Sequence, residues 1–248
     1  MPPPPADAAF TVTPIGFLRS AFREKFGIPR QPGLTPSARS VLEIRPPFDR
    51  AEAFRGLEGF SHLWLIFWFH GLPSADWRPT VRPPRLGGNR RVGVFATRSG
   101  FRPNPIGLSA VALEGVEREA GRLALRLRGA DLLDGTPVLD VKPYLPYADR
   151  ISAAAGGFAE GAPPDPLPVT FAPEAEAVAA EREAGGAADL RSLIVELLRA
   201  DPRPAYRRDR PDGRVYGVRL MDLNIRWRVD DEGVRVLSLH PVSEEAES

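Results

Sequence analysis

The order of short strand-like runs along the chain constrains its fold more than any other feature. Alternating or continuously apolar stretches predict strands over residues 10–19, 41–45, 61–70, 92–96, 108–116, 123–127 and 138–141. The runs over 108–116 and 123–127 should pair as an antiparallel hairpin. No long helix alternates with these strands, which argues against a doubly wound parallel sheet. The sequence therefore predicts a mainly β protein, an antiparallel β-barrel or strongly curved sheet with a small α+β C-terminal domain.

A linker should separate the barrel from the smaller domain. Residues 151–168 are rich in Ala, Gly and Pro and show little periodicity. Beyond them, leucines at helical spacing predict a helix over 188–200, with Asp189 as its N-cap, and strands are predicted over 215–220, 225–229 and 234–239. We expect a disordered Pro-rich tail over 1–9, a barrel over 10–150, the second domain over 169–240 and an acidic tail over 241–248.

Local patterns within the barrel region give further expectations. The run SHLWLIFWFH over 61–70 is typical of a central strand buried on both faces. Asp49 is a predicted N-cap for a short helix over 50–54. Residues 77–88, rich in Pro and Arg, should form an ordered loop, and Asp134-Gly135 predicts a turn before the strand over 138–141.

The stretch RRVGVFATRSGFRPNPIGLS, residues 90–109, combines two predicted strands with a stiff polar loop. Turn-forming residues over 97–100 break the first strand, and Pro103 and Pro105 restrict the backbone on both sides of Asn104. Such a loop, held by strands on either side, is a frequent place for ligand-binding groups, here Arg98 and Asn104.

The basic charge of the chain is concentrated around this loop. The formal net charge is only +1, yet residues 77–107 contain seven arginines and no acid. A focused basic patch favours an anionic partner such as phosphate, carboxylate or nucleic acid. The alternative is a surface crossover whose arginines serve only solubility.

Composition excludes several classes of site. The chain has no cysteine, which rules out disulfides, thiol nucleophiles and Cys-ligated metals, and its three histidines leave little room for a metal site. We therefore expect no metal, and the lack of thiols fits a reducing cytoplasm. No apolar run reaches the roughly 18 residues of a membrane span, so no membrane partner is expected.

Polar groups on four Pro- or Gly-stiffened segments suit a ligand that is both nucleoside and amino acid. Arginine offers a fork for a carboxylate, aspartate accepts from an ammonium or ribose hydroxyl, and the amides can read a purine edge. A Ser99-His70-Asp134 hydrolase lacks the G-x-S-x-G elbow, and neither dinucleotide nor P-loop motifs occur. His70 alternatively bonds only to backbone at a strand end. The groups are Arg30 and Gln31, His70, Arg98 and Asn104, and residues 134–137.

Several long strings carry a family resemblance. FREKFGIPRQPGL, LEGFSHLWLIFWFH, WRPTVRPPRLGGNRRVGVFATRSGFRPNPIGLS, LLDGTPVLDVKPY and DPRPAYR resemble the TrmO family, also called TsaA or YaeB. The resemblance implies an S-adenosylmethionine-dependent tRNA methyltransferase that acts on N6 of N6-threonylcarbamoyladenosine, just 3′ of the anticodon. It also implies a single-sheeted β-barrel and a homodimer. A non-catalytic nucleotide- or RNA-binding barrel module is the alternative function.

The resemblance further implies a set of contacts to S-adenosylmethionine. Most of these positions coincide with the polar groups named above, whereas Leu108 would supply an apolar or backbone contact. The implied cofactor-binding residues are Pro29, Arg30, Gln31, His70, Gly71, Arg98, Leu108, Asp134, Gly135, Thr136 and Pro137.

Two further groups are predicted to meet the tRNA anticodon arm. Lys142 should bind the threonyl carboxylate of the substrate, with Asp140 orienting it, and Asn104 completes the candidate catalytic set. An i, i+2 pair shares one face of a strand, so Asp140 and Lys142 alternatively form only a structural ion pair. The candidate RNA-binding residues are Arg78, Arg82, Arg85, Arg102, Arg203, Arg207 and Arg208.

Overall fold

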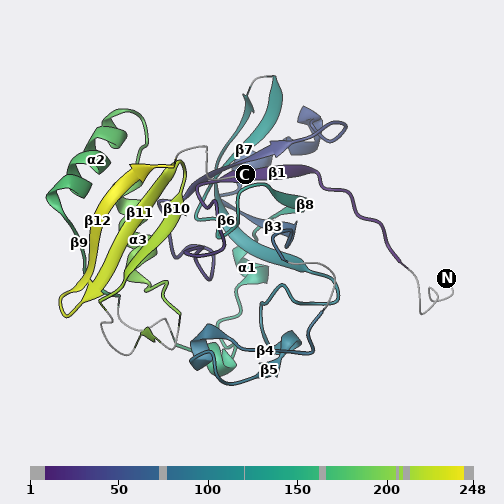
Figure 1. Ribbon diagram of the computed structural model, residues 1–248. Helices are drawn as coiled ribbons and strands as arrows, with labels where there is room; N and C mark the ends of the chain where they lie inside the picture. Colours follow the sequence, from purple (N-terminus) through teal and green to yellow (C-terminus); the bar gives the residue numbers. More distant parts are fainter. Residues whose placement is uncertain are drawn as a thin grey trace.

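Six strands close into an antiparallel barrel (Figure 1). The computed structural model describes residues 9–72, 77–119, 121–161, 166–204, 207–208 and 213–242, so the predicted tails lie largely outside the described residues. Around the barrel the order is β1-β2-β7-β6-β3-β8. The predicted mainly β fold with an antiparallel barrel is thereby confirmed. The strands are β1 Gly16–Ser20, β2 Arg39–Ile44, β3 His62–Trp68, β6 Ile106–Glu119, β7 Arg122–Arg128 and β8 Thr136–Pro143.

Strand β3 shows how alternation fills the barrel. Leu63, Leu65 and Phe67 point inward and are at most 3% exposed, whereas Trp64 and Ile66 on the other face are half-buried. The prediction that this strand is buried on both faces is wrong. A closed barrel has one interior, and the outer side of β3 is only partly covered.

The hairpin of β6 and β7 and the turn before β8 follow the sequence pattern. β6 pairs antiparallel with β7 from Ala112↔Arg128 to Glu119↔Arg122, which confirms the predicted hairpin. Gly135 has a φ of 75°, a left-handed conformation that favours glycine, and it forms the predicted turn with Asp134.

The predicted strand over 92–96 is wrong beyond Gly93. β5 Val92–Gly93 pairs with β4 Thr80–Val81, and a 3₁₀ turn, η4 Val94–Ala96, follows at once. The Thr97 N–H donates to the Val94 carbonyl at 3.0 Å and closes this turn. Residues 77–88, predicted as loop, contain β4 and the short helix η3 Pro84–Leu86.

The remaining barrel connections carry short helices. These are η1 Ala51–Phe54, η2 Leu57–Gly59, α1 Pro146–Asp149 and, in the predicted linker, η5 Gly157–Ala159. The N-cap of η1 is Arg50 and no side chain caps it, so the prediction of Asp49 as the cap is wrong.

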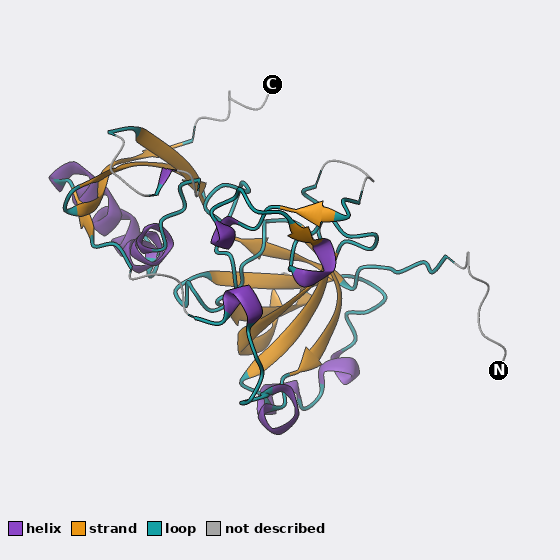
Figure 2. Ribbon diagram, turned by 90° about the horizontal axis from the view of Figure 1, so that it is seen from below, coloured by secondary structure: helices purple, strands orange, loops and turns teal. Residues whose placement is uncertain are grey.

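A four-stranded sheet covered by two helices forms the second domain (Figures 1 and 2). The strand order is β10-β11-β12-β9, with β9 parallel to β12. The predicted helix and three strands are present, whereas β9 and α2 were not predicted. The elements are β9 Val169–Phe171, α2 Pro173–Ala184, α3 Leu190–Arg199, β10 Val215–Leu220, β11 Leu223–Asp230 and β12 Gly233–Pro241.

Asp189 precedes α3 but does not cap it through its side chain. Its φ of 66° turns the carboxylate toward the barrel, where it accepts a hydrogen bond from Arg39 at 2.8 Å and lies 3.7 Å from Arg128. The predicted N-cap is therefore an ion pair between the two domains instead.

The connection between β1 and β2 belongs to both domains. Ala21, Phe22 and Ala38 are at most 5% exposed and pack in the core of the second domain, among residues of α2, α3 and its sheet. Phe22 also forms a β-bridge with Leu220. The loop that contains residues 29–31 is thus fixed at both ends, by Phe22 on one side and Ala38 on the other, in the core of the second domain.

Gly107 gives a test of the barrel packing. A Cβ at this position would lie 2.1–2.7 Å from three ring atoms of the buried Phe67, which cannot yield. We expect Gly107→Ala to lower the free energy of unfolding by about 1–3 kcal/mol in urea titrations. On the same strand, a Cβ added at Gly115 would lie 3.6 Å from its nearest atom. Gly115→Ala should therefore change the free energy of unfolding by less than about 0.5 kcal/mol. Equal midpoints for the two variants would contradict the close packing.

Candidate active site

The structure brings two distant predicted segments together at Gln31 and Arg98. Arg98 Nη1 donates a hydrogen bond to Gln31 Oε1 at 2.6 Å, across a sequence separation of 67 residues. Gln31 lies in the β1–β2 connection and Arg98 in the turn after η4. Both side chains are exposed, so the pair remains accessible to a ligand.

Asp131 lies within the electrostatic influence of Arg98, and the sequence reasoning missed it. Its carboxylate accepts a hydrogen bond from Ser109 Oγ at 2.6 Å. Burial raises the pKa of Asp131, while the Ser109 hydrogen bond and the positive charge of Arg98 act in the opposite direction. Leu108, the residue before Ser109 in β6, points outward and is 52% exposed. The signal available in the sequence was a carboxylate three residues before the predicted turn at Asp134-Gly135.

A second meeting point lies between His70 and the turn at Asp134. Partial burial and the charge of Lys25 lower the pKa of His70, against a hydrogen bond with the Asp134 backbone and the charge of its carboxylate. A Cβ on Gly71 would lie 3.0 Å from Leu133 Cδ2 and 3.2 Å from Lys25 Cε. A larger residue here would push the ends of the Leu133 and Lys25 side chains aside, so glycine favours the close approach of the chain after β3 to the turn.

The carboxylate of Asp134 is committed to the protein. It accepts hydrogen bonds from the Ser20 N–H at 2.9 Å and from Arg23, and the side chain is 14% exposed. Thr136 is 2% exposed and its hydroxyl donates to the Leu133 carbonyl at 2.6 Å. The expectation that the Asp134 side chain receives a ligand ammonium or hydroxyl therefore needs correction. The turn, which includes Gly135 and Pro137, can contact a ligand mainly through its backbone N–H and carbonyl groups.

The second domain reaches the loop at residues 29–31. Pro29 is half-buried, and Arg30 still reaches solvent. Partial burial and the neighbouring Arg208 lower the pKa of Arg30 to about 10, and Asp201 acts in the opposite direction. The charge of Arg208, a residue of the second domain, therefore acts on Arg30 in the candidate cofactor loop.

The Asp140–Lys142 pair lies on the outer face of β8. Lys142 Nζ is 2.9 Å from Asp140 Oδ2, and the two side chains are 63% and 48% exposed respectively. Ile66 of β3 is the register partner of both Asp140 and Leu108, so these residues share one face, two strand spacings or about 10 Å apart. The candidate catalytic pair and the exposed Leu108 thus border the same surface.

The loop that carries Asn104 is held by Arg102. Arg102 Nη1 donates to the carbonyls of Thr97 at 2.7 Å and Val94 at 3.3 Å, and its guanidinium lies 5.4 Å from the Phe95 ring centroid. Asn104 is exposed at the tip of this loop. Arg102 therefore holds the loop through its Nη1, and only the other nitrogens of its guanidinium can contact RNA.

The other predicted RNA contacts fall into two groups. Arg78, Arg82 and Arg85 are exposed near β4, with Arg78 stacked 4.3 Å from the Phe101 ring centroid and Arg85 donating to the Gly161 carbonyl. These three stay predictions. Arg207 and Arg208 are half-buried, and Arg208 donates to the carbonyls of Asp201 at 2.5 Å and Arg203 at 3.1 Å.

Arg203 is placed where RNA cannot reach it. It is 2% exposed, and its Nε and Nη2 each donate to the Asp201 carboxylate at 2.8 Å. The prediction that Arg203 faces the anticodon arm is wrong. A fork that matches both carboxylate oxygens is a strong charge-assisted pair, and here it fixes the segment after α3.

Comparison with known proteins identifies the family of this chain. The sequence model of the tRNA-methyltransferase O N-terminal domain matches residues 17–150, and that of the TrmO C-terminal domain matches residues 164–242. This chain belongs to the tRNA-methyltransferase O family. The predicted resemblance is confirmed.

Members of the tRNA-methyltransferase O family match between about two thirds of this chain and nearly its whole length. The tRNA (adenine(37)-N6)-methyltransferase of Escherichia coli K12 is 49% identical over 94% of this chain and 99% of its own. Its counterpart from Eikenella corrodens is 52% identical over 69% of this chain and 92% of its own. The crystal structure of TrmO from Pseudomonas aeruginosa superposes with a TM-score of 0.78 at 46% identity, over 94% of this chain and 98% of that one.

Within the described ranges, no helix is long and apolar enough to cross a membrane. Among the same residues, no three His, Asp or Glu side chains are grouped as a metal site would need.

Arg203 supplies a test of how the second domain is held. Removing one partner of a buried pair leaves an uncompensated charge, so Arg203→Ala should lower the free energy of unfolding by about 3–5 kcal/mol. Arg199→Ala, at an exposed position at the end of α3, is the matched control and should have little effect. Unchanged thermal unfolding of Arg203→Ala together with weaker RNA binding would instead restore the RNA-contact prediction.

Proposed function

We propose that this chain is an S-adenosylmethionine-dependent methyltransferase that modifies N6 of adenosine 37 in tRNA. The observation that carries this function is the similarity to the Escherichia coli tRNA (adenine(37)-N6)-methyltransferase along nearly the full length of both chains. The related RcsF protein of Pseudomonas aeruginosa, 54% identical over 88% of this chain, bears a name that assigns it to the S-adenosylmethionine-dependent methyltransferases.

The residues of the candidate site fit S-adenosylmethionine. Arg98, oriented by Gln31 at 2.6 Å, can bind the carboxylate of the amino-acid part. The exposed Leu108 and the backbone of the turn at Gly135 supply apolar and hydrogen-bonding contacts for the nucleoside part. When bound, S-adenosylmethionine supplies an electrophilic methyl group on a sulfonium.

The finer substrate in this proposal is adenosine whose N6 carries a threonylcarbamoyl group. Such a group presents a carboxylate, and Lys142 is an exposed ammonium on the face that Leu108 borders. Asp140 holds the ammonium at 2.9 Å and fixes its direction. The N6 proton leaves to the carboxylate bound by Lys142 or to a water, and Asn104, exposed on its stiff loop, positions the base.

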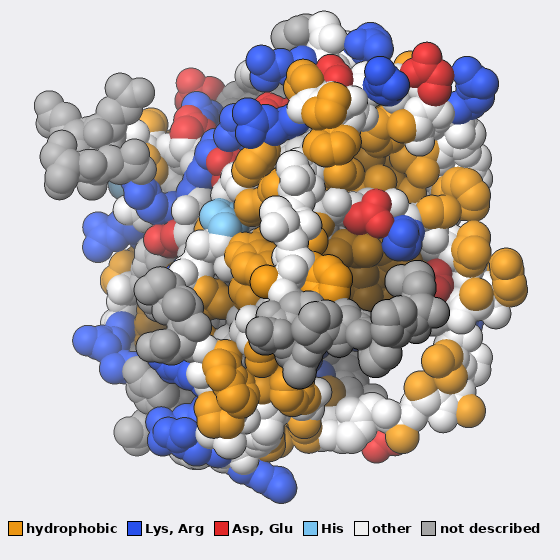
Figure 3. All heavy atoms as spheres, turned by 90° about the vertical axis from the view of Figure 1, so that its right-hand side faces the viewer, with side chains coloured by type: hydrophobic (Ala, Val, Ile, Leu, Met, Phe, Trp, Pro, Cys, Tyr) orange, Lys and Arg blue, Asp and Glu red, His pale blue; other side chains and the backbone are white. Residues whose placement is uncertain are grey.

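We also propose that the protein acts as a cytoplasmic homodimer. Large apolar side chains are exposed on the barrel and at the start of the linker, with Ile106 at 42%, Tyr147 at 87% and Ile151 at 71%. Figure 3 shows hydrophobic side chains gathered over the middle of one face. Exposed apolar surface of this kind marks an interaction site. A cytoplasmic location follows from the tRNA substrate.

The proposed domain division is a barrel over 10–150, a linker over 151–168 and a second domain over 169–240. Two separate clusters of buried residues support it. The buried cluster of the second domain also includes Ala21, Phe22 and Ala38 of the β1–β2 connection. The barrel and the second domain should therefore depend on each other for stability.

The function is tested by methyl transfer from labelled S-adenosylmethionine to tRNA from a strain that lacks the enzyme. Mass spectrometry of the nucleosides should find the new methyl group on threonylcarbamoyladenosine. Folded protein that neither transfers methyl groups nor binds S-adenosylmethionine in calorimetry would instead support a binding module.

Arg98→Ala tests the cofactor site. Loss of a charge-assisted hydrogen bond typically costs about 1.5–3 kcal/mol, so the affinity for S-adenosylmethionine should fall roughly 10- to 100-fold in calorimetry. Arg82→Ala, an exposed loop arginine outside the Arg98–Gln31 contact, should leave it unchanged. Unchanged cofactor affinity with a smaller salt dependence of RNA binding would show that Arg98 contacts phosphate.

Lys142→Met tests the substrate-carboxylate site. Misplacing the substrate should reduce the methylation rate about 100-fold, while cofactor affinity and melting temperature stay unchanged. Lys142→Arg keeps the positive charge and should retain most of the rate. A normal rate for Lys142→Met would leave the Asp140–Lys142 pair with a structural role only.

A further inference from the structure

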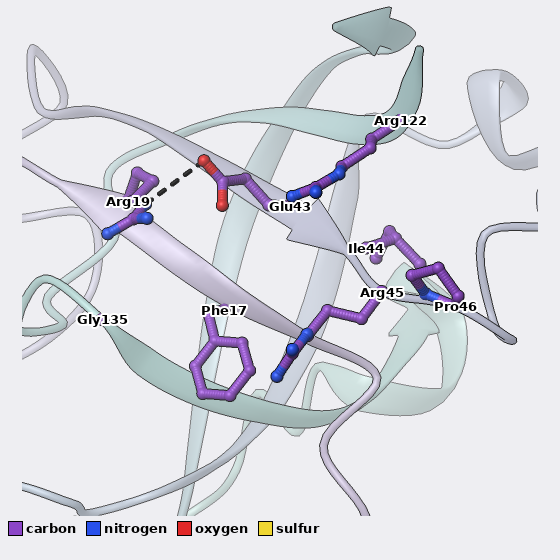
Figure 4. A pocket seen from close by; sticks show the side chains of 8 residues that line it. All are labelled: Phe17, Arg19, Glu43, Ile44, Arg45, Pro46, Arg122 and Gly135. Atoms are coloured by element: carbon purple, nitrogen blue, oxygen red, sulfur yellow. Dashed lines mark hydrogen bonds and ion pairs between the residues drawn. The ribbon is translucent and has the colours of Figure 1, made fainter. Parts of the chain in front are cut away.

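A pocket on the outer face of the barrel shares only Gly135, at its edge, with the candidate site described above. Its volume is about 620 Å³, within the usual size range for ligand sites (Figure 4). It lies beside the candidate cofactor turn, since Gly135 is at its edge and Phe17 is the register partner of Pro137. Its main side chains are Phe17, Arg19, Glu43, Arg45 and Arg122, from β1, β2, the segment after β2, and β7.

The pocket carries more positive charge than its acids balance. Arg19 is paired, since its Nε lies 3.2 Å from Glu43 and its Nη1 4.0 Å from Asp134. Among the carboxylates whose side chains the structure describes, a set that leaves out Glu119, none lies within the 4.0 Å ion-pair distance of Arg45 or Arg122. In Figure 4 these two side chains approach the pocket from different sides. Two guanidiniums without acidic partners fit the oxygens of a phosphate.

Phe17 adds an aromatic surface to this charge. The Arg45 guanidinium lies 5.2 Å from the Phe17 ring centroid, and the ring is half-buried between β2 and β8. Aromatic rings and guanidinium planes are the groups on which unstacked RNA bases stack. An aromatic ring next to unpaired arginines is therefore suited to a base and its phosphate together.

S-adenosylmethionine is a poor match for this pocket. Its single carboxylate is outweighed by its own ammonium and sulfonium charges, so two additional guanidiniums would repel it. A nucleotide phosphate carries no such compensating charge.

We propose that this pocket binds a nucleotide of the tRNA substrate other than the one that is methylated. Along β8, Lys142 lies five residues beyond Pro137, which corresponds to about 16 Å in a strand. The occupant of the pocket and the nucleotide at Lys142 are therefore different residues of the same RNA. The proposal rests on the proposed function only in taking tRNA as the substrate.

The test measures binding of a synthetic anticodon stem–loop RNA by fluorescence anisotropy over a series of salt concentrations. Phe17→Leu removes the stacking surface and should weaken binding about tenfold without changing the salt dependence. The double variant Arg45→Gln, Arg122→Gln should weaken binding and reduce the slope of log affinity against log salt by about 1–2. Phe17→Trp keeps a stacking surface and should bind normally.

Arg226→Gln is the matched control, because Arg226 is an exposed arginine on β11 of the second domain. RNA affinities of the pocket variants equal to this control, with unchanged melting temperatures, would overturn the proposal. Loss of S-adenosylmethionine affinity in the pocket variants would assign the pocket to the cofactor and also overturn it. Adenosine monophosphate serves as a competitor, and its binding at the pocket without any effect on RNA affinity would again overturn it.

These outcomes are independent of the proposed function. Wild-type protein that binds the RNA but transfers no methyl group would refute the methyltransferase proposal. The difference in RNA affinity between Phe17→Leu and Arg226→Gln would still show whether the pocket binds a nucleotide of the RNA.

Discussion

Burial of Phe22 in the core of the second domain is the contact on which the candidate site depends. Phe22 is 2% exposed and follows β1 of the barrel directly, yet its neighbours are residues of α3 and β10. The chain must therefore leave the barrel, cross to the second domain and return to β2. The loop with Arg30 and Gln31 lies on this excursion, so both domains determine where it meets Arg98.

The sequence could predict those elements whose side chains repeat with a clear period. The hairpin of β6 and β7 and helix α3 were found because apolar residues recur at spacings of two, or of three and four. Helix α2 was missed because its buried positions are alanines, Ala175 and Ala179, in a segment rich in exposed alanine and glutamate. The turn at Val94 was missed because a hydrogen bond, from the Thr97 N–H, replaces the strand pairing that the alternation suggested.

The site was predictable in its outline but not in the role of each group. Sequence reasoning selected Gln31 and Arg98, which meet at 2.6 Å, yet it gave Asp134 a ligand role although its carboxylate holds Ser20 and Arg23. Arginines were the hardest to assign. From composition alone, every arginine is expected at the surface. Arg203 is instead 2% exposed, and its Nε and Nη2 donate to the two carboxylate oxygens of Asp201. Only burial separates a structural arginine from one available to RNA.

The shared core also has a consequence for synthesis of the chain. The Glu24 carboxylate, two residues after Phe22, accepts a hydrogen bond from the Arg219 N–H, a partner 195 residues later. Ribosomes add about 5–20 residues per second, so this segment waits roughly 10–40 s for the strand that covers it. During that interval Phe22 is an uncovered aromatic on a nascent polypeptide. The connection between β1 and β2 thus reaches its final position only after β10 has left the ribosome.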